Sequence, residues 1–193
     1  MSRRARPAAG PRVLGIDPGT RRTGWGVIEP WGPRARVVAS GVIAAGDKRP
    51  LEKRLRTIHE GLAAVIAEHG PRAVAVEEIF HHKFANAAMK LGHARGVALL
   101  AAASADLEVF AYAPSLVKRT VAGRGRADKA QVARLVTAIL QLDETPPEDA
   151  SDALEYGRQE GEALEDSKCF PVRGLEPGPE PEPEAEAEAE AEA

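Results

Sequence analysis

The chain has 193 residues, of which 44% are hydrophobic, a composition typical of one globular domain with a sizeable core. Its one cysteine, Cys169, excludes an intramolecular disulfide framework and favours a reducing compartment. No apolar run approaches the ~20 residues that cross a membrane, and the basic start lacks the apolar core of a signal peptide. We therefore expect a cytoplasmic protein with no membrane contact.

The acidic residues are concentrated at the end of the chain. Residues 176–193 consist of Pro, Gly, Glu and Ala alone, with eight Glu and no basic residue. Without those eight, 26 Lys and Arg stand against 21 of the 29 Asp and Glu, a net charge of +5. That charge suits a polyanionic partner, although a mildly basic domain without such a partner would carry it too. We expect residues 1–11 to form a disordered basic leader and 176–193 a disordered acidic tail.

The first half of the chain predicts three strands, a helix and a further strand. Three short strands with brief links indicate an antiparallel meander: 12–16, 24–28 and 35–43. Apolar residues then recur at helical spacing over 51–68, and Gly70-Pro71 ends that helix. The apolar run 73–76 follows, and a strand that is apolar on both faces is typical of the parallel centre of a sheet.

The second half alternates helices and strands. Residues 84–105 predict a helix that is apolar around much of its circumference, and therefore buried against the sheet and other helices or against a second subunit. A strand at 107–111 and three helices follow, the helices at 114–121, at 129–140 and from about 146 onward. A meander followed by alternating helices and strands predicts an α/β domain with a mixed five-stranded sheet flanked by helices.

Four carboxylates are candidate metal ligands: Asp17, Glu77, Asp149 and Asp152. Asp17 ends the first strand and opens a Pro-Gly-Thr turn, and Glu77 ends the strand at 73–76. The two later aspartates lie three apart at the start of the last helix, so they share one face. Acids that converge from strand ends and a helix are the oxygen ligands that hard divalent cations need. Each acid alone has an ordinary explanation, such as turn capping or the helix dipole.

Several alternatives stay open at this level. Glu77 and Glu78 are adjacent, so they point to opposite faces and only one can join Asp17. Phe80 is either a core residue or a ring that stacks on a base. Basic residues around the glycine loop at 123–126 are phosphate contacts or ordinary solvated surface: Lys118, Arg124, Arg126 and Lys129.

The turn after Asp17 also resembles the first phosphate loop of the actin and hexokinase superfamily of ATPases. Those proteins contain a duplicated domain, and this chain shows no second copy.

Five segments together resemble the RuvC family of bacterial Holliday junction endonucleases. They cover 12–154 in the family's order and spacing: Leu14–Ile28, Ala75–Phe80, Lys90–Ala98, Val117–Val132 and Asp149–Leu154. The resemblance implies an RNase H-like fold, a homodimer and two Mg²⁺ ions per active site, which Mn²⁺ can replace. It also selects Glu77 over Glu78, because the family's glutamate falls two residues after Ala75.

The resemblance also implies residue roles. The four carboxylates take the family's metal-ligand positions, Phe80 the ring near the junction centre, and Lys118 and Lys129 the lysines that contact DNA. The implied activity is Mg²⁺-dependent, paired and symmetric nicking of a four-way junction, which leaves 5′-phosphate and 3′-hydroxyl ends. One metal ion would activate water and the other would stabilise the leaving oxygen. The implied partners are the RuvA and RuvB branch-migration proteins.

Two other functions remain alternatives, and one segment departs from the family. The alternatives are a junction-binding protein that does not cleave and an RNase H-like nuclease of the YqgF type acting on RNA. The departure is at 155–162, where the last helix has little apolar face and two glycines, each costing about 1 kcal/mol in a helix interior. We therefore expect a nuclease domain at 12–154 and a divergent segment at 155–175, and the sequence leaves open whether this segment completes the last helix.

Overall fold

The protein is described by a computed structural model that covers residues 10–31, 34–78, 85–112, 134, 137–140, 142 and 144–165, with the side chains of 34, 85–87 and 161–165 left out. Its elements in chain order are β1 (Val13–Asp17), β2 (Arg22–Trp31), β3 (Arg34–Ala44), α1 (Leu51–His69), β4 (Ala73–Glu77), α2 (Ala85–Ala103), β5 (Glu108–Tyr112) and α5 (Glu148–Glu165). Most of the predicted helices at 114–121 and 129–140 lie outside the described residues. None of the described helices is long and apolar enough to cross a membrane.

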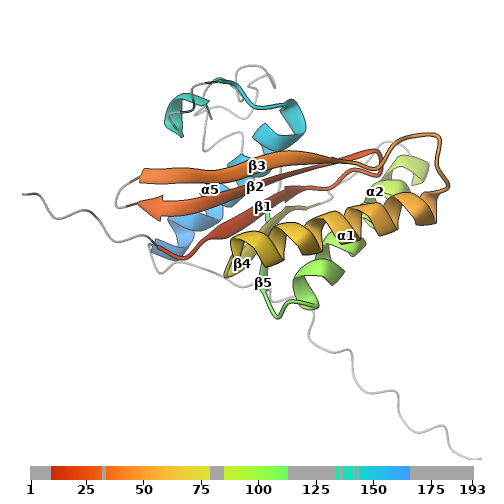
Figure 1. Cartoon of the computed structure of the whole chain (residues 1–193), viewed down its shortest axis with the longest axis horizontal. Helices are drawn as coiled ribbons and strands as arrows, with labels where there is room; N and C mark the ends of the chain where they lie inside the picture. The colour runs from red at the N-terminus through yellow and green to blue at the C-terminus, as the bar shows by residue number, and fades with distance from the viewer. Residues whose placement is uncertain are drawn as a thin grey trace, which may run out of the picture.

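The strands form one mixed sheet in the order β3-β2-β1-β4-β5 (Figure 1). β1, β2 and β3 pair antiparallel, whereas β4 pairs parallel with both β1 and β5. The predicted meander and the predicted parallel strand at 73–76 are both confirmed. β1 ends at Asp17 and β4 ends at Glu77. Because these two strands are parallel neighbours, both residues lie at the same end of the sheet.

Different helices cover the two faces of the sheet (Figure 1). Strand side chains that alternate along the chain, among them Leu14 and Val76, join residues of α1 and α2 in one core. The side chains between them point to the other face, where Val13 and Ala75 pack against Tyr156 of α5. The molecule is therefore a three-layer sandwich of helices, sheet and helix.

Glycines in the strands allow the α5 backbone to lie directly on the sheet. A Cβ atom at Gly15 would lie 1.8 Å from the carbonyl oxygen of Ala153, and one at Gly24 would lie 1.8 Å from that of Asp149. No side chain fits in such a gap, so these two positions require glycine. Because Gly24 is the strand partner of Asp17, the same contact places the start of α5 beside the end of β1.

The divergent segment completes the last helix, which is neither short nor poorly packed. α5 continues to Glu165, and every residue from Ala150 to Arg158 is buried or partly buried. Gly157 packs against the backbone of Gly15, where its own Cβ would lie 3.2 Å from the Gly15 nitrogen. The apolar side chains that the segment lacks are replaced by close backbone contact and by paired polar groups. One such pair is Glu155 with Arg158, whose Oε1 and Nη2 atoms lie 3.3 Å apart.

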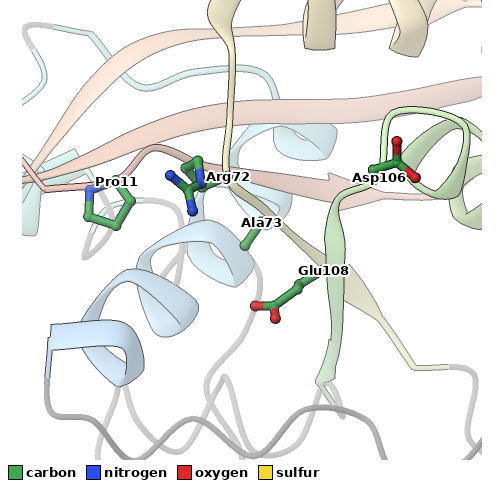
Figure 2. Close-up of a pocket in the computed structure, with 5 residues that line it drawn as sticks. All are labelled: Pro11, Arg72, Ala73, Asp106 and Glu108. Carbon is green, nitrogen blue, oxygen red and sulfur yellow. The ribbon is translucent and has the colours of Figure 1, made fainter.

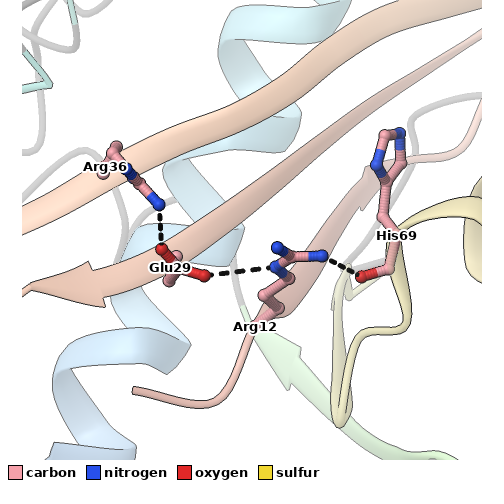
Figure 3. Close-up of polar contacts among 4 residues, drawn as sticks. All are labelled: Arg12, Glu29, Arg36 and His69. Carbon is pink, nitrogen blue, oxygen red and sulfur yellow. Dashed lines mark hydrogen bonds and ion pairs between the residues drawn. The ribbon is translucent and has the colours of Figure 1, made fainter. Parts of the chain in front are cut away.

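A buried glutamate of β2 links β3 to the residue that precedes β1, at the end of the sheet opposite to Asp17 (Figure 3). Glu29 accepts hydrogen bonds from Arg36 and, over 3.2 Å, from Arg12. Arg12 also donates to the main-chain oxygen of His69 at the end of α1, over 2.7 Å. Burial acts to raise the pKa of Glu29, but the bonds from the two arginines outweigh it and lower that pKa. The cluster therefore holds an ionised carboxylate in the fold, far from the carboxylates at Asp17.

Candidate active site

The structure brings the four predicted carboxylates together. Asp17 and Glu77 end the neighbouring parallel strands β1 and β4, and Asp149 and Asp152 lie in the first turns of α5. α5 crosses the sheet on the face to which Gly15 and Ala75 belong, and this is also the face of Asp17 and Glu77. The acids of the helix therefore lie over the acids at the strand ends.

The raised pKa of Asp17 reflects this convergence. Its burial, followed by the charge of Glu77 and a hydrogen bond with Glu77, raises the pKa of Asp17 to about 8. The charges of Asp152 and Asp149 raise it further. A carboxyl that keeps its proton near neutral pH marks a site with more negative charge than its surroundings balance.

The tertiary structure distinguishes Glu77 from its neighbour. Glu77 continues the face of Ala75, which packs under α5, and its side chain hydrogen-bonds with Asp17. Glu78 follows the strand, and its main-chain N–H donates to the main-chain oxygen of Tyr112 over 2.9 Å. Alternation along the strand directs Glu78 away from the α5 face.

Two residues that the sequence did not single out contact these carboxylates. Arg22, at the start of β2, places its Nε atom 2.6 Å from Oδ2 of Asp149. Tyr156 of α5 is 4% exposed and hydrogen-bonds with Glu77. Burial and the charges of the nearby acids raise the pKa of Tyr156, so it stays a neutral phenol. The spacing of four between Asp152 and Tyr156 was the available signal, because it puts both on one helix face.

The donor chemistry of the site fits a hard divalent cation. Four carboxylates supply only oxygen ligands, and their mutual repulsion at Asp17 is what a cation would relieve. Within the described part of the chain, however, no three acids, histidines or cysteines form a ready-made metal cage. One oxygen of Asp149 is engaged by Arg22 instead. The four carboxylates therefore fit a hard divalent cation by the chemistry of their oxygen ligands.

The predicted DNA contacts all lie outside the described residues: Phe80, Lys118, Arg124, Arg126 and Lys129.

A surface pocket of about 600 Å³ lies away from the carboxylates (Figure 2). Its lining includes Arg72 and Ala73 at the start of β4, and Asp106 and Glu108 at the start of β5. These are the ends of the parallel strands opposite to Glu77. The pocket is therefore no part of the carboxylate site.

The fold and the carboxylates together define a class. A mixed sheet in the order β3-β2-β1-β4-β5, with acids at the ends of β1 and β4 and on a helix that crosses them, is the arrangement of an RNase H-like nuclease. A family model described as crossover junction endodeoxyribonuclease RuvC matches residues 13–156. The chain belongs to this family of Holliday junction resolvases, which act in DNA recombination and repair.

Individual relatives agree with the family model. The chain is 52% identical over 151 residues to a RuvC crossover junction endodeoxyribonuclease of Bradyrhizobium diazoefficiens, covering 78% of this chain and 86% of the relative. A solved structure of Thermus thermophilus RuvC in complex with a Holliday junction substrate matches with a TM-score of 0.77 and 35% identity, covering 84% of this chain and 99% of that one. The yeast mitochondrial Holliday junction resolvase Ydc2 shares the fold alone, with a TM-score of 0.57, 10% identity and coverage of 81% and 82%.

Proposed function

We propose that the protein resolves four-way DNA junctions by metal-dependent hydrolysis at Asp17, Glu77, Asp149 and Asp152. The observation that carries the proposal is the convergence of these acids at Asp17, whose burial, together with the charges of the other three, raises its pKa to about 8. Membership of the RuvC family and the likeness to a structure solved with a Holliday junction substrate support the choice of DNA. The expected products are paired symmetric nicks with 5′-phosphate and 3′-hydroxyl ends.

The four carboxylates would hold two Mg²⁺ ions, or Mn²⁺ in their place. Such ions, when bound, supply an activated water and stabilise the charge on the leaving oxygen. The residues themselves have separate tasks. Asp17 and Glu77 present oxygens from rigid strand ends, whereas Asp149 and Asp152 present theirs from the first turns of α5. Ligands on rigid elements keep the geometry that in-line attack on a phosphodiester requires.

We also infer that the protein acts as a homodimer through α2. Met89 and Leu100 are 61% and 56% exposed and lie three helical turns apart, on the same side of the helix. The opposite side of α2 is buried against the core through residues such as Ala98. A large exposed apolar side chain at each end of one helix face is typical of a surface that a second subunit covers. A two-fold dimer would present two active sites to a near-symmetric junction.

The family likeness further suggests the setting of the reaction. We place it in the bacterial cytoplasm, downstream of branch migration by RuvA and RuvB. The bacterial relatives and the single cysteine support this placement.

A nicking assay on a synthetic four-way junction with Mg²⁺ tests the proposal. The wild-type protein should nick two opposite strands, and Asp17→Asn should reduce the rate by at least about 100-fold, the equivalent of ~3 kcal/mol of lost transition-state stabilisation. Glu77→Gln should behave like Asp17→Asn and still bind the junction. Glu78→Gln is the matched control and should keep most of the activity.

Other outcomes would favour the alternatives. Junction binding by the wild type without any nick would indicate a binding protein. Faster cutting of RNA than of junctions would indicate a YqgF-type nuclease. Loss of activity in Glu78→Gln with retention in Glu77→Gln would overturn the assignment of the ligand.

A further inference from the structure

The segment that departs from the family pattern supplies polar side chains to the interior. It begins at Glu155, and in the folded protein it continues α5 across the sheet. Tyr156 is 4% exposed and Glu160 is fully buried. The hydroxyl of Tyr112 on β5 donates to Oε2 of Glu160. These side chains are therefore part of the layer directly behind the carboxylate site.

Tyr156 lies on the helix face that carries the two aspartates. It follows Asp152 by four residues and Asp149 by seven, spacings that repeat on one side of a helix. Its ring packs against Val13 and Ala75, two residues of the sheet face beneath α5. Ala75 and Glu77 are two apart on β4, so they share that face. The ring thus lies along the strand that leads to Glu77.

We propose that Tyr156 is a positioning residue, whose buried hydroxyl donates to the Glu77 carboxylate and holds it in the orientation that binds metal. The inference rests on the proposed function of Glu77. It assigns a role to Tyr156, a residue of the divergent segment. Neither the sequence motifs nor the family match assigns Tyr156 a role.

The physical reason is the rigidity of the ligand. A glutamate side chain rotates about three bonds, and ordering it costs conformational entropy. A hydrogen bond to one carboxylate oxygen from a donor fixed by packing removes that freedom before the metal arrives. Groups that orient metal ligands in this way typically change metal affinity or activity by 10- to 100-fold.

A purely packing role for Tyr156 makes a different prediction. Phenylalanine keeps the ring and its contacts with Val13 and Ala75, and removes only the hydroxyl. Tyr112 offers a matched control, because it is the strand partner of Glu77 and its hydroxyl bonds with Glu160. Tyr112→Phe removes the same atom from the same layer, at a hydroxyl that donates to Glu160.

The test compares full-length wild type, Tyr156→Phe and Tyr112→Phe in three measurements: Mn²⁺ affinity without DNA, the Mg²⁺ concentration for half-maximal nicking, and junction affinity in EDTA. We expect Tyr156→Phe to weaken Mn²⁺ binding by about 10-fold and to raise the Mg²⁺ requirement by a similar factor, with junction affinity unchanged. Tyr112→Phe should match the wild type in all three. Melting temperatures in EDTA monitor the fold of each variant.

Three results would overturn the inference. Wild-type Mn²⁺ affinity and Mg²⁺ dependence in Tyr156→Phe would leave the tyrosine with a packing role alone. An equal loss in Tyr112→Phe would show that any polar change in the layer disturbs the site. A wild-type protein that binds no Mn²⁺ and cuts no junction would overturn the proposed function as well.

Discussion

Ionisation of Asp17 is unfavourable in the folded protein when no cation is present. Its carboxyl has an ordinary pKa of 3.8, and burial beside three other acids raises that pKa to about 8 in the fold. Between these values the folded protein holds a proton that the unfolded chain has lost. The free energy of unfolding must therefore fall as pH rises from about 4 to about 8, by at most ~1.4 kcal/mol per pH unit.

This linkage predicts how Asp17→Asn changes stability. The amide has no charge to bury, so the variant should lose less stability than the wild type between pH 5 and pH 8. Thermal unfolding in EDTA at both pH values measures the difference. At pH 8 the inactive variant should be the more stable protein. Parallel pH profiles for the two proteins would contradict the raised pKa.

At the scale of elements, the contact between α5 and the sheet decides whether the site forms. The helix backbone passes close above Gly15 and Gly24 on β1 and β2. That approach is closer than side-chain packing permits, and it sets the height of Asp149 and Asp152 above the strand ends. The same contact explains how a helix with few apolar residues becomes well buried, because its backbone atoms pack where side chains usually do.

Gly15→Ala should therefore be severely destabilising. The added methyl would lie 1.8 Å from the Ala153 oxygen, so α5 would have to move away from β1. We expect a loss of ~3 kcal/mol or more in the free energy of unfolding, measured by urea denaturation, because overpacking of a dense core typically costs 1–3 kcal/mol even where flexible side chains can yield.

Gly157→Ala is the matched comparison for this prediction. Its methyl would lie 3.2 Å from the Gly15 nitrogen, a much milder conflict. Alanine also gains about 1 kcal/mol over glycine inside a helix. The two effects oppose each other, so its stability should stay within about 1 kcal/mol of the wild type. Equal losses in both variants would show that the severity of the steric conflict does not set the loss of stability.

At the scale of the whole molecule, the proposed dimer through the exposed face of α2 can be tested by one substitution. Leu100→Glu would place a charge on this face, where Leu100 is 56% exposed and its replacement disturbs little of the core. We expect the variant to be monomeric by sedimentation and to make single nicks at junctions in place of paired nicks. Ala64→Glu on the exposed side of α1 is the control and should stay dimeric. A dimeric Leu100→Glu protein would move the interface elsewhere.

The sequence by itself predicted the described strands and helices, the mixed sheet and the four candidate acids. Hydrophobic periodicity is a local property, so the strands and the helices α1 and α2 were predictable to within a few residues. Asp17 and Glu77 were recognisable because each follows an apolar run, and the family motif joined Asp149 and Asp152 to them.

Only the tertiary structure decided how these parts contact one another. The helix that contains the divergent segment is long and buried, because Gly15 and Gly157 allow the α5 backbone to lie directly on β1. The family resemblance already favoured Glu77 over Glu78, and the fold adds the physical reason, because the face of β4 that carries Ala75 and Glu77 lies under α5. Contacts such as Arg22 with Asp149 and Tyr156 with Glu77 join residues far apart in the chain. Such contacts depend on the packing of whole elements against one another, so local sequence patterns do not predict them.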